Sequence, residues 1–97
     1  MKQLFLAIHY PRPEHADDLV AAMGRFGSAV RAAPGVEHVS AWRAGDRIVA
    51  ISIWDSPDRI VAARPAMSEA LAGVLFDDWE QRPRELLLLD EVVTATP

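Results

Sequence analysis

The sequence predicts an α+β domain of the ferredoxin-like kind, in which a four-stranded antiparallel sheet carries two helices on one face in the order β-α-β-β-α-β. Three observations support this prediction. Apolar runs open and close the chain, apolar residues recur with helical spacing between them, and a glycine-containing turn joins two strands in the middle. Because the chain has 97 residues, of which 51% are hydrophobic, we expect a single domain over residues 1–97.

The N-terminal third predicts one strand and one helix. Residues 4–10 form an apolar run bounded by prolines, which indicates a strand buried on both faces. A helix then opens at Pro13 or Glu14, and Pro34-Gly35 ends it. Its apolar residues recur at alternating spacings of four and three, which places them on one face of the helix. These residues are Leu19, Met23, Phe26, Val30 and Ala33.

The middle of the chain predicts a hairpin followed by a second helix. Two strands, residues 36–43 and 47–54, are joined by the turn 44–46. Ser56 is a favoured N-cap and Pro57 a favoured first helical residue, so a helix is expected to begin there.

The continuation of this second helix is expected to be interrupted. Arg64-Pro65 predicts a break after about Ala63, with a second helical segment from Pro65 to about Phe76. Met67 and Leu71 are expected to point inward from that segment, and a polar loop over 77–83 is expected to follow it.

The last predicted strand, residues 85–93, contains four consecutive leucines, and like the first strand it is apolar on both faces. Two helices cover only one face of such a sheet, and an exposed apolar face would be a large adhesive patch. The same face of a second copy, related by a two-fold axis, is the simplest cover. The sequence therefore predicts a homodimer with its sheets face to face.

Composition restricts the partners and the location. The formal net charge is −4 and no basic cluster is present, so nucleic acid and anionic membranes are not expected as partners. No apolar stretch approaches the roughly 18 residues of a membrane span. The chain has no cysteine, which excludes disulfides, thiol catalysis and cysteine-bound metal. Because the first apolar run reads as a strand rather than a signal peptide, a cytoplasmic location is expected.

One stretch of the chain resembles a known group of proteins. Pro34-Gly35 is followed by a strand, a turn and an apolar strand that ends in Trp54-Asp55-Ser56, and this pattern is similar to that of the antibiotic biosynthesis monooxygenase (ABM) superfamily of dimeric α/β barrels. The resemblance extends to the order of elements over nearly the whole chain.

The resemblance implies a function as well as a fold. It implies a monooxygenase that needs no cofactor and acts on an aromatic, polyketide-like or quinone-type molecule, bound between the sheet and its helices. The alternative is a homodimeric binding protein of the same fold that performs no chemistry.

The resemblance also places the Trp-bearing face of the third strand against the ligand. Ala50, Ser52 and Trp54 would then be ligand contacts, and the small side chains beside the indole would leave room for a flat aromatic molecule. Trp54 has a second interpretation as a core residue packed beneath the helices.

The contribution of the second strand depends on the length of the hairpin loop. A three-residue loop would place His38, Ser40 and Trp42 on the ligand face, whereas a two-residue loop would place Val39 and Ala41 there. With the longer loop, His38 is the expected catalytic acid–base group because imidazole titrates near neutral pH.

Two positions depart from the pattern of the superfamily's oxygenases. These enzymes resemble one another in carrying an asparagine four residues before the tryptophan and a tyrosine six residues after it. Ala50 and Ile60 occupy those positions here, where they are expected to contact the ligand. Neither side chain can donate a hydrogen bond, which favours the binding-protein alternative.

The remaining polar groups carry weaker predictions. His9 is expected to be a hydrogen-bonded strand histidine near the dimer seam, and His15 a solvated residue in a first helical turn. Asp77, Asp78 and Glu80 are expected to lie in a solvated loop. No spacing of histidines and carboxylates in the sequence predicts a metal site.

Overall fold

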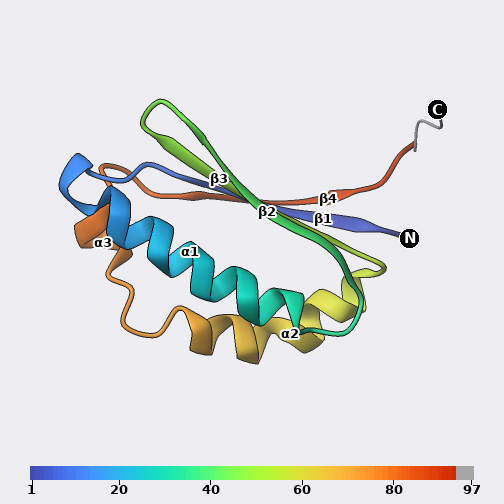
Figure 1. Ribbon diagram of the computed structural model, residues 1–97. Coiled ribbons are helices and arrows are strands. Elements are labelled where there is room, and N and C mark those ends of the chain that lie inside the picture. The colour runs from blue at the N-terminus through green and yellow to red at the C-terminus, as the bar shows by residue number, and fades with distance from the viewer. Residues whose placement is uncertain (94–97) are drawn as a thin grey trace.

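The computed structural model describes residues 1–93 and has the predicted ferredoxin-like α+β architecture (Figure 1). Its strands are β1 (Gln3–His9), β2 (Val36–Ala44), β3 (Arg47–Trp54) and β4 (Glu85–Asp90). Its main helices are α1 (Ala16–Arg31) and α2 (Pro57–Ala70). The short 3-10 helix η1 (Pro13–His15) precedes α1, and the single turn α3 (Phe76–Trp79) follows α2.

The sheet is antiparallel throughout, with strand order β2-β3-β1-β4. Figure 1 shows α1 and α2 side by side on one face of it. Since side chains alternate along a strand, Phe5, Ala7 and His9 of β1 point towards the helices. Leu4, Leu6 and Ile8 point to the opposite face, which no segment of residues 1–93 covers in Figure 1 and which we name the open face.

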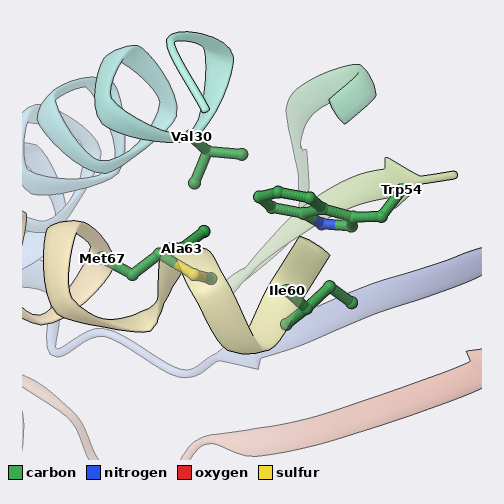
Figure 2. Close-up of a cluster of buried hydrophobic side chains, with 5 residues drawn as sticks. All are labelled: Val30, Trp54, Ile60, Ala63 and Met67. Atoms are coloured by element: carbon green, nitrogen blue, oxygen red, sulfur yellow. The ribbon is translucent and has the colours of Figure 1, made fainter. Parts of the chain in front are cut away.

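Trp54 lies in the part of the core where β3 meets the helices. Its side chain has no exposed surface, and the indole ring lies between Val30 of α1 and Ile60 of α2 (Figure 2). Ala63 and Met67 complete this cluster. The core-packing interpretation of Trp54 therefore describes its surroundings, and the predicted apolar face of α1 is confirmed by Val30 and by a second cluster around Leu19, Ala22, Met23 and Ile48.

The hairpin between β2 and β3 has a two-residue turn, so the three-residue alternative was wrong. Ala44 pairs directly with Arg47, and Gly45 takes a φ of +61°, which suits the first central residue of a tight hairpin turn. Ser52 consequently faces Val39 across the ladder, and Ala50 faces Ala41. The register is therefore the one that the shorter loop predicted for β2. Val39 and Ala41 face the helices, while His38, Ser40 and Trp42 lie on the open face.

The predicted break at Arg64-Pro65 was also wrong, because α2 continues through Pro65 to Ala70. A proline inside a helix removes one backbone hydrogen bond and crowds the preceding turn. Here both Pro65 and Val61, whose carbonyl loses its partner, are exposed to solvent, so water can satisfy the free carbonyl. Ser56 and Pro57 open the helix as predicted, although the Ser56 side chain makes no capping hydrogen bond.

The C-terminal segment differs from its prediction at both ends. The expected loop 77–83 begins inside the helical turn α3, and β4 ends at Asp90 rather than at residue 93. Pro11 forms an isolated bridge with Glu80, which attaches the end of α3 to the chain after β1. This attachment positions the polar groups described below.

Candidate functional site

Two adjoining cavities lie on the helix side of the sheet. The larger, of about 360 Å³, lies between α1 and strands β2 and β3, and the smaller, of about 180 Å³, lies between β1, α2 and α3. They share four wall residues: Phe5, Met23, Phe26 and Ala50. Because the walls are shared, a ligand in one cavity lies directly against the other. A protein pocket for a drug-sized ligand has about 300–1,000 Å³, so the two cavities together offer room for a ligand of several rings.

The predicted contacts on β3 and α2 divide between wall and core. Ala50 borders both cavities, and Ser52 borders the larger one. Trp54 and Ile60 belong to the core cluster and border neither of the two. The indole Nε1–H of Trp54 donates to Ser52 Oγ at 2.8 Å, so its polar group is satisfied within the core.

The predicted contacts on β2 form a separate group on the open face. Ser40 Oγ lies 2.8 Å from His38 Nε2 and accepts a hydrogen bond from Trp42 Nε1 at 2.8 Å. Ser40 also borders the larger cavity, but its side chain belongs to the other side of the sheet. The register therefore separates the imidazole of His38 from both cavities.

A different histidine borders the smaller cavity. His9, at the end of β1, is 3% exposed, and its Nδ1 lies 3.4 Å from Oε2 of Glu80, which is buried to the same degree. His9 is a hydrogen-bonded strand histidine as predicted, but its side chain points to the helix side and not to the open face, where the dimer seam was expected. The expectation that Glu80 is solvated was wrong.

Backbone hydrogen bonds between the end of α3 and the segment after β1 hold Glu80 in place. Its Oε1 accepts the backbone N–H of Tyr10 at 2.9 Å. Around it, Arg12 N–H donates to the carbonyl of Trp79 at 2.7 Å, and Gln81 N–H donates to the carbonyl of Tyr10 at 2.8 Å. These bonds join residues 10–12 to residues 79–81, which fixes the carboxylate relative to the imidazole.

Burial lowers the pKa of His9 below its ordinary value of 6.5, because the cationic imidazolium loses its hydration. The carboxylate of Glu80 acts in the opposite direction, and the guanidinium of Arg84 adds to the lowering. The net effect is a neutral imidazole at neutral pH.

Aromatic and cationic groups surround this imidazole. Phe76 of α3 stacks on the His9 ring with centroids 5.7 Å apart, and the guanidinium of Arg84 lies 4.1 Å from the centroid of Phe76. Arg64 of α2 borders the same cavity. An apolar cavity edged by an imidazole and two guanidinium groups is suited to an aromatic molecule with an acidic or anionic substituent.

Sequence reasoning missed Glu80 and Arg84 and undervalued His9. The alternation of β1 places His9 on the same face as Phe5 and Ala7. Assigning Phe5 to the core would therefore have placed His9 on the helix side. Glu80 carried no such signal, because it stands in a polar segment and lies 71 residues from His9 along the chain.

Comparison with solved structures shows which proteins share this architecture. Rv0793 from Mycobacterium tuberculosis superposes with a TM-score of 0.86 at 19% identity, over 99% of this chain and 100% of that one. SnoaB, a cofactor-independent oxygenase from Streptomyces nogalater, superposes with a TM-score of 0.78 at 16% identity, over 96% and 95% of the two chains. A protein described as an antibiotic biosynthesis monooxygenase gives 0.77 at 14% identity, over 96% and 100%.

The chain has the fold of the antibiotic biosynthesis monooxygenases. No family model matches the sequence, and no curated protein matches it either. At these identities the ABM likeness is one of architecture, and the chemistry of the site has to be argued from the residues described above.

Two further observations concern the described part of the chain. Within residues 1–93, no group of three or more histidine, cysteine, aspartate or glutamate side chains is arranged to hold a metal ion. None of the helices described is long and apolar enough to cross a membrane.

Proposed function

We propose that the protein is a cofactor-independent monooxygenase that acts on an aromatic, polyketide-like or quinone-type molecule. The observation that carries the proposal is the pair of adjoining apolar cavities on the helix side of an ABM-type sheet, with a buried imidazole at the end of one of them. The larger cavity would receive the ring system, and the smaller would receive the acidic substituent beside His9.

The proposed reaction needs only the substrate and molecular oxygen. An anthrone-like phenol that has lost a proton is electron-rich and can reduce oxygen itself. The resulting hydroperoxide loses water, so a ring CH₂ group becomes a carbonyl group, one oxygen atom enters the product and the other leaves as water. The protein would bind the substrate, accept its proton and exclude bulk water.

Oxygen uptake with an anthrone-like phenol tests the proposal. We expect one O₂ consumed for each quinone formed, and we expect Ala50→Phe to abolish turnover by filling the wall shared by both cavities. Ala62→Phe, at an exposed position of α2, is the matched control and should retain activity. Binding of the phenol without oxygen uptake would reject the oxygenase proposal.

A specific observation favours the alternative of a non-catalytic binding protein. Ala50 presents only a methyl group to the cavities, and Ile60 is buried in the core, so neither supplies a hydrogen bond to a ligand. In this alternative an aromatic ligand raises the thermal stability according to RT ln(1 + [L]/Kd), and no product forms. A thermal shift together with a product assay on the same samples separates the two functions.

The proposal includes a homodimer formed through the open face. At its centre, Leu6 of β1 pairs with Ile51 of β3 on one side and with Leu87 of β4 on the other. Leu87 is 46% exposed in the single chain, and Leu89 beside it is 45% exposed. A contiguous apolar surface of this kind is typical of an interface, and a second copy would cover it with an identical one.

Light scattering at micromolar concentration tests the dimer. We expect twice the chain mass of 10.7 kDa for the natural sequence. Leu6→Glu would place charges at the centre of the interface and should give monomers. Val61→Glu, on the exposed side of α2, is the control and should leave the dimer intact. A monomeric natural protein at this concentration would contradict the proposal.

A further inference from the structure

We propose that His9 accepts the proton of a ligand hydroxyl group in the smaller cavity, and that Glu80 holds the imidazole in the form able to accept it. The inference rests on the proposed function in one respect, since it requires an aromatic ligand with an acidic hydroxyl group. It names His9 as a catalytic residue and Glu80 as a positioning residue for that ligand.

The hydrogen bonds of Glu80 assign the proton on the His9 ring. One carboxylate oxygen is occupied by the Tyr10 N–H at 2.9 Å, and the other lies 3.4 Å from His9 Nδ1. A carboxylate can only accept hydrogen bonds, so Nδ1 carries the hydrogen. In the neutral ring, Nε2 is then the free acceptor.

Nε2 of His9 is open to the cavity. Nε2 has no hydrogen-bond partner among residues 1–93. Every fully buried side-chain nitrogen and oxygen of these residues has a hydrogen-bond partner, so Nε2 is not one of the fully buried atoms. Nε2 must therefore retain accessible surface. Because the side chain is 3% exposed and borders the smaller cavity, that surface faces the cavity.

The charges around His9 act on both partners of the proton transfer, and Arg84 disfavours the imidazolium while Glu80 favours it. Three charged groups border the imidazole or its cavity: Glu80 at the end of α3, Arg84 before β4 and Arg64 of α2. Transfer converts a phenol and a neutral imidazole into a phenolate and an imidazolium, with no other bond changed. Glu80 stabilises the imidazolium, and the two guanidinium groups stabilise the phenolate. No carboxylate in the described part of the chain forms an ion pair with either arginine.

The probe for the test is 4-nitrophenol, a single-ring phenol whose neutral and ionised forms absorb at different wavelengths. With the natural protein in saturating excess, we expect its apparent pKa to fall by about 1 unit or more, which is a tenfold increase in ionisation at fixed pH. An unchanged pKa of the bound probe would overturn the proposal. Failure of the probe to bind at millimolar concentration would overturn it as well.

Glu80→Gln tests the positioning role. The Tyr10 N–H requires an acceptor, which the amide oxygen supplies, so the amide nitrogen is left to donate to His9 Nδ1. The ring must then carry its hydrogen on Nε2, where it cannot accept the ligand proton. We expect this variant to bind the neutral probe as before and to lose the part of the pKa shift that His9 supplies. A full shift in Glu80→Gln would contradict the role of Glu80.

Two matched substitutions test His9 itself. His9→Gln should lose the larger part of the shift, because an amide does not take up a proton in this pH range, and should keep only the part that the guanidinium groups of Arg64 and Arg84 supply. His15→Gln changes a histidine outside the cavity, one that pairs with Asp18, and should keep the full shift. Equal shifts in both variants would show that His9 is not the acceptor.

Nitrogen NMR of the imidazoles provides a test that needs no substitution at these buried sites. In the natural protein, Nε2 of His9 should be unprotonated without the probe and protonated when 4-nitrophenol is bound. A resonance that stays in the unprotonated range at saturation would contradict the proposal.

The oxygenase function and the role of the His9–Glu80 pair can be rejected independently of each other. An ionised bound probe without oxygen uptake from anthrone-like phenols would leave the His9–Glu80 pair standing and reject the oxygenase. An unchanged pKa of the probe bound to the natural protein, together with oxygen uptake at an unchanged rate in Glu80→Gln, would reject the pair and retain the oxygenase.

Discussion

The sequence contains two Ser-x-Trp segments, 40–42 on β2 and 52–54 on β3, which share a local hydrogen bond and differ in everything around it. In both, the indole Nε1–H donates to the serine Oγ two residues earlier, at 2.8 Å. Trp54 has no exposed surface, whereas Trp42 is 63% exposed. Because the two strands are neighbours, the difference arises from which face each segment occupies, and identical local chemistry therefore has different consequences for stability.

The largest expected difference between the two segments is the cost of removing the indole. Trp54→Ala should lower the free energy of unfolding by about 3–5 kcal/mol, because it leaves a cavity among Val30, Ile60 and Met67. Trp42→Ala should cost less than about 0.5 kcal/mol in the monomer, since its ring is largely in water. Urea unfolding at a concentration too low for association measures both, and similar losses would refute the comparison.

The hydrogen bond itself gives the next largest difference. Ser52→Ala should cost about 1–3 kcal/mol, because the buried indole N–H of Trp54 is left without an acceptor. Ser40→Ala should be within about 0.5 kcal/mol of the natural protein, since water can replace the serine at the exposed indole of Trp42. Thermal or urea unfolding of the pair measures this, and an equally large loss for Ser40→Ala would show that exposure does not explain the difference.

The turn that separates the two segments provides a smaller effect. Gly45 has a φ of +61°, and an L-amino acid in that conformation costs about 1–2 kcal/mol, so Gly45→Ala should destabilise the hairpin by roughly this amount. The control is Gly24→Ala in α1, where an added Cβ meets no atom within 4 Å. That change should stabilise the protein by up to about 1 kcal/mol. Destabilisation by both substitutions would argue against a specific role of the turn.

The smallest effect concerns pH and extends the comparison to the strand histidines, of which His9 points to the helix side and His38 to the open face. Because burial lowers the pKa of folded His9 below 6.5, the unfolded chain binds more protons between that lowered pKa and 6.5. Its contribution to stability is complete above 6.5 and is lost as the pH falls through this window. Urea unfolding over a pH series should show this slope, and His9→Gln should reduce it. An unchanged slope would contradict the assignment.

Much of the fold could be predicted because it depends on neighbours in the sequence. The spacing of Leu19, Met23 and Val30 defined the buried face of α1, and the apolar first and last strands indicated an uncovered sheet face. The start of α2 at Pro57 followed from local capping preferences. The break at Pro65 was wrong because the penalty of an internal proline depends on whether the freed carbonyl meets solvent or protein, which local sequence does not state.

The candidate site could be predicted only in part. Ala50 and Ser52 were expected at a cavity and border one, because their strand alternation is anchored by the buried Trp54. The choice of His38 depended on a loop length that was open by one residue, and a one-residue change moves every side chain of the strand to the other face. The sequence does hold a signal for the shorter loop, since Gly45-Asp46 suits a two-residue turn with glycine first.

Periodicity and turn chemistry were sufficient for the order of the elements, the buried face of α1 and the apolar character of both sheet faces, because each is encoded within a few neighbouring residues. The cavities, the register of β2 and the meeting of His9 with Glu80 arise from contacts between distant segments. His9 and Glu80 are 71 residues apart, and they meet because backbone hydrogen bonds join residues 10–12 to 79–81. No local pattern encodes such a pairing, since its free energy depends on the packing of the whole sheet against its helices.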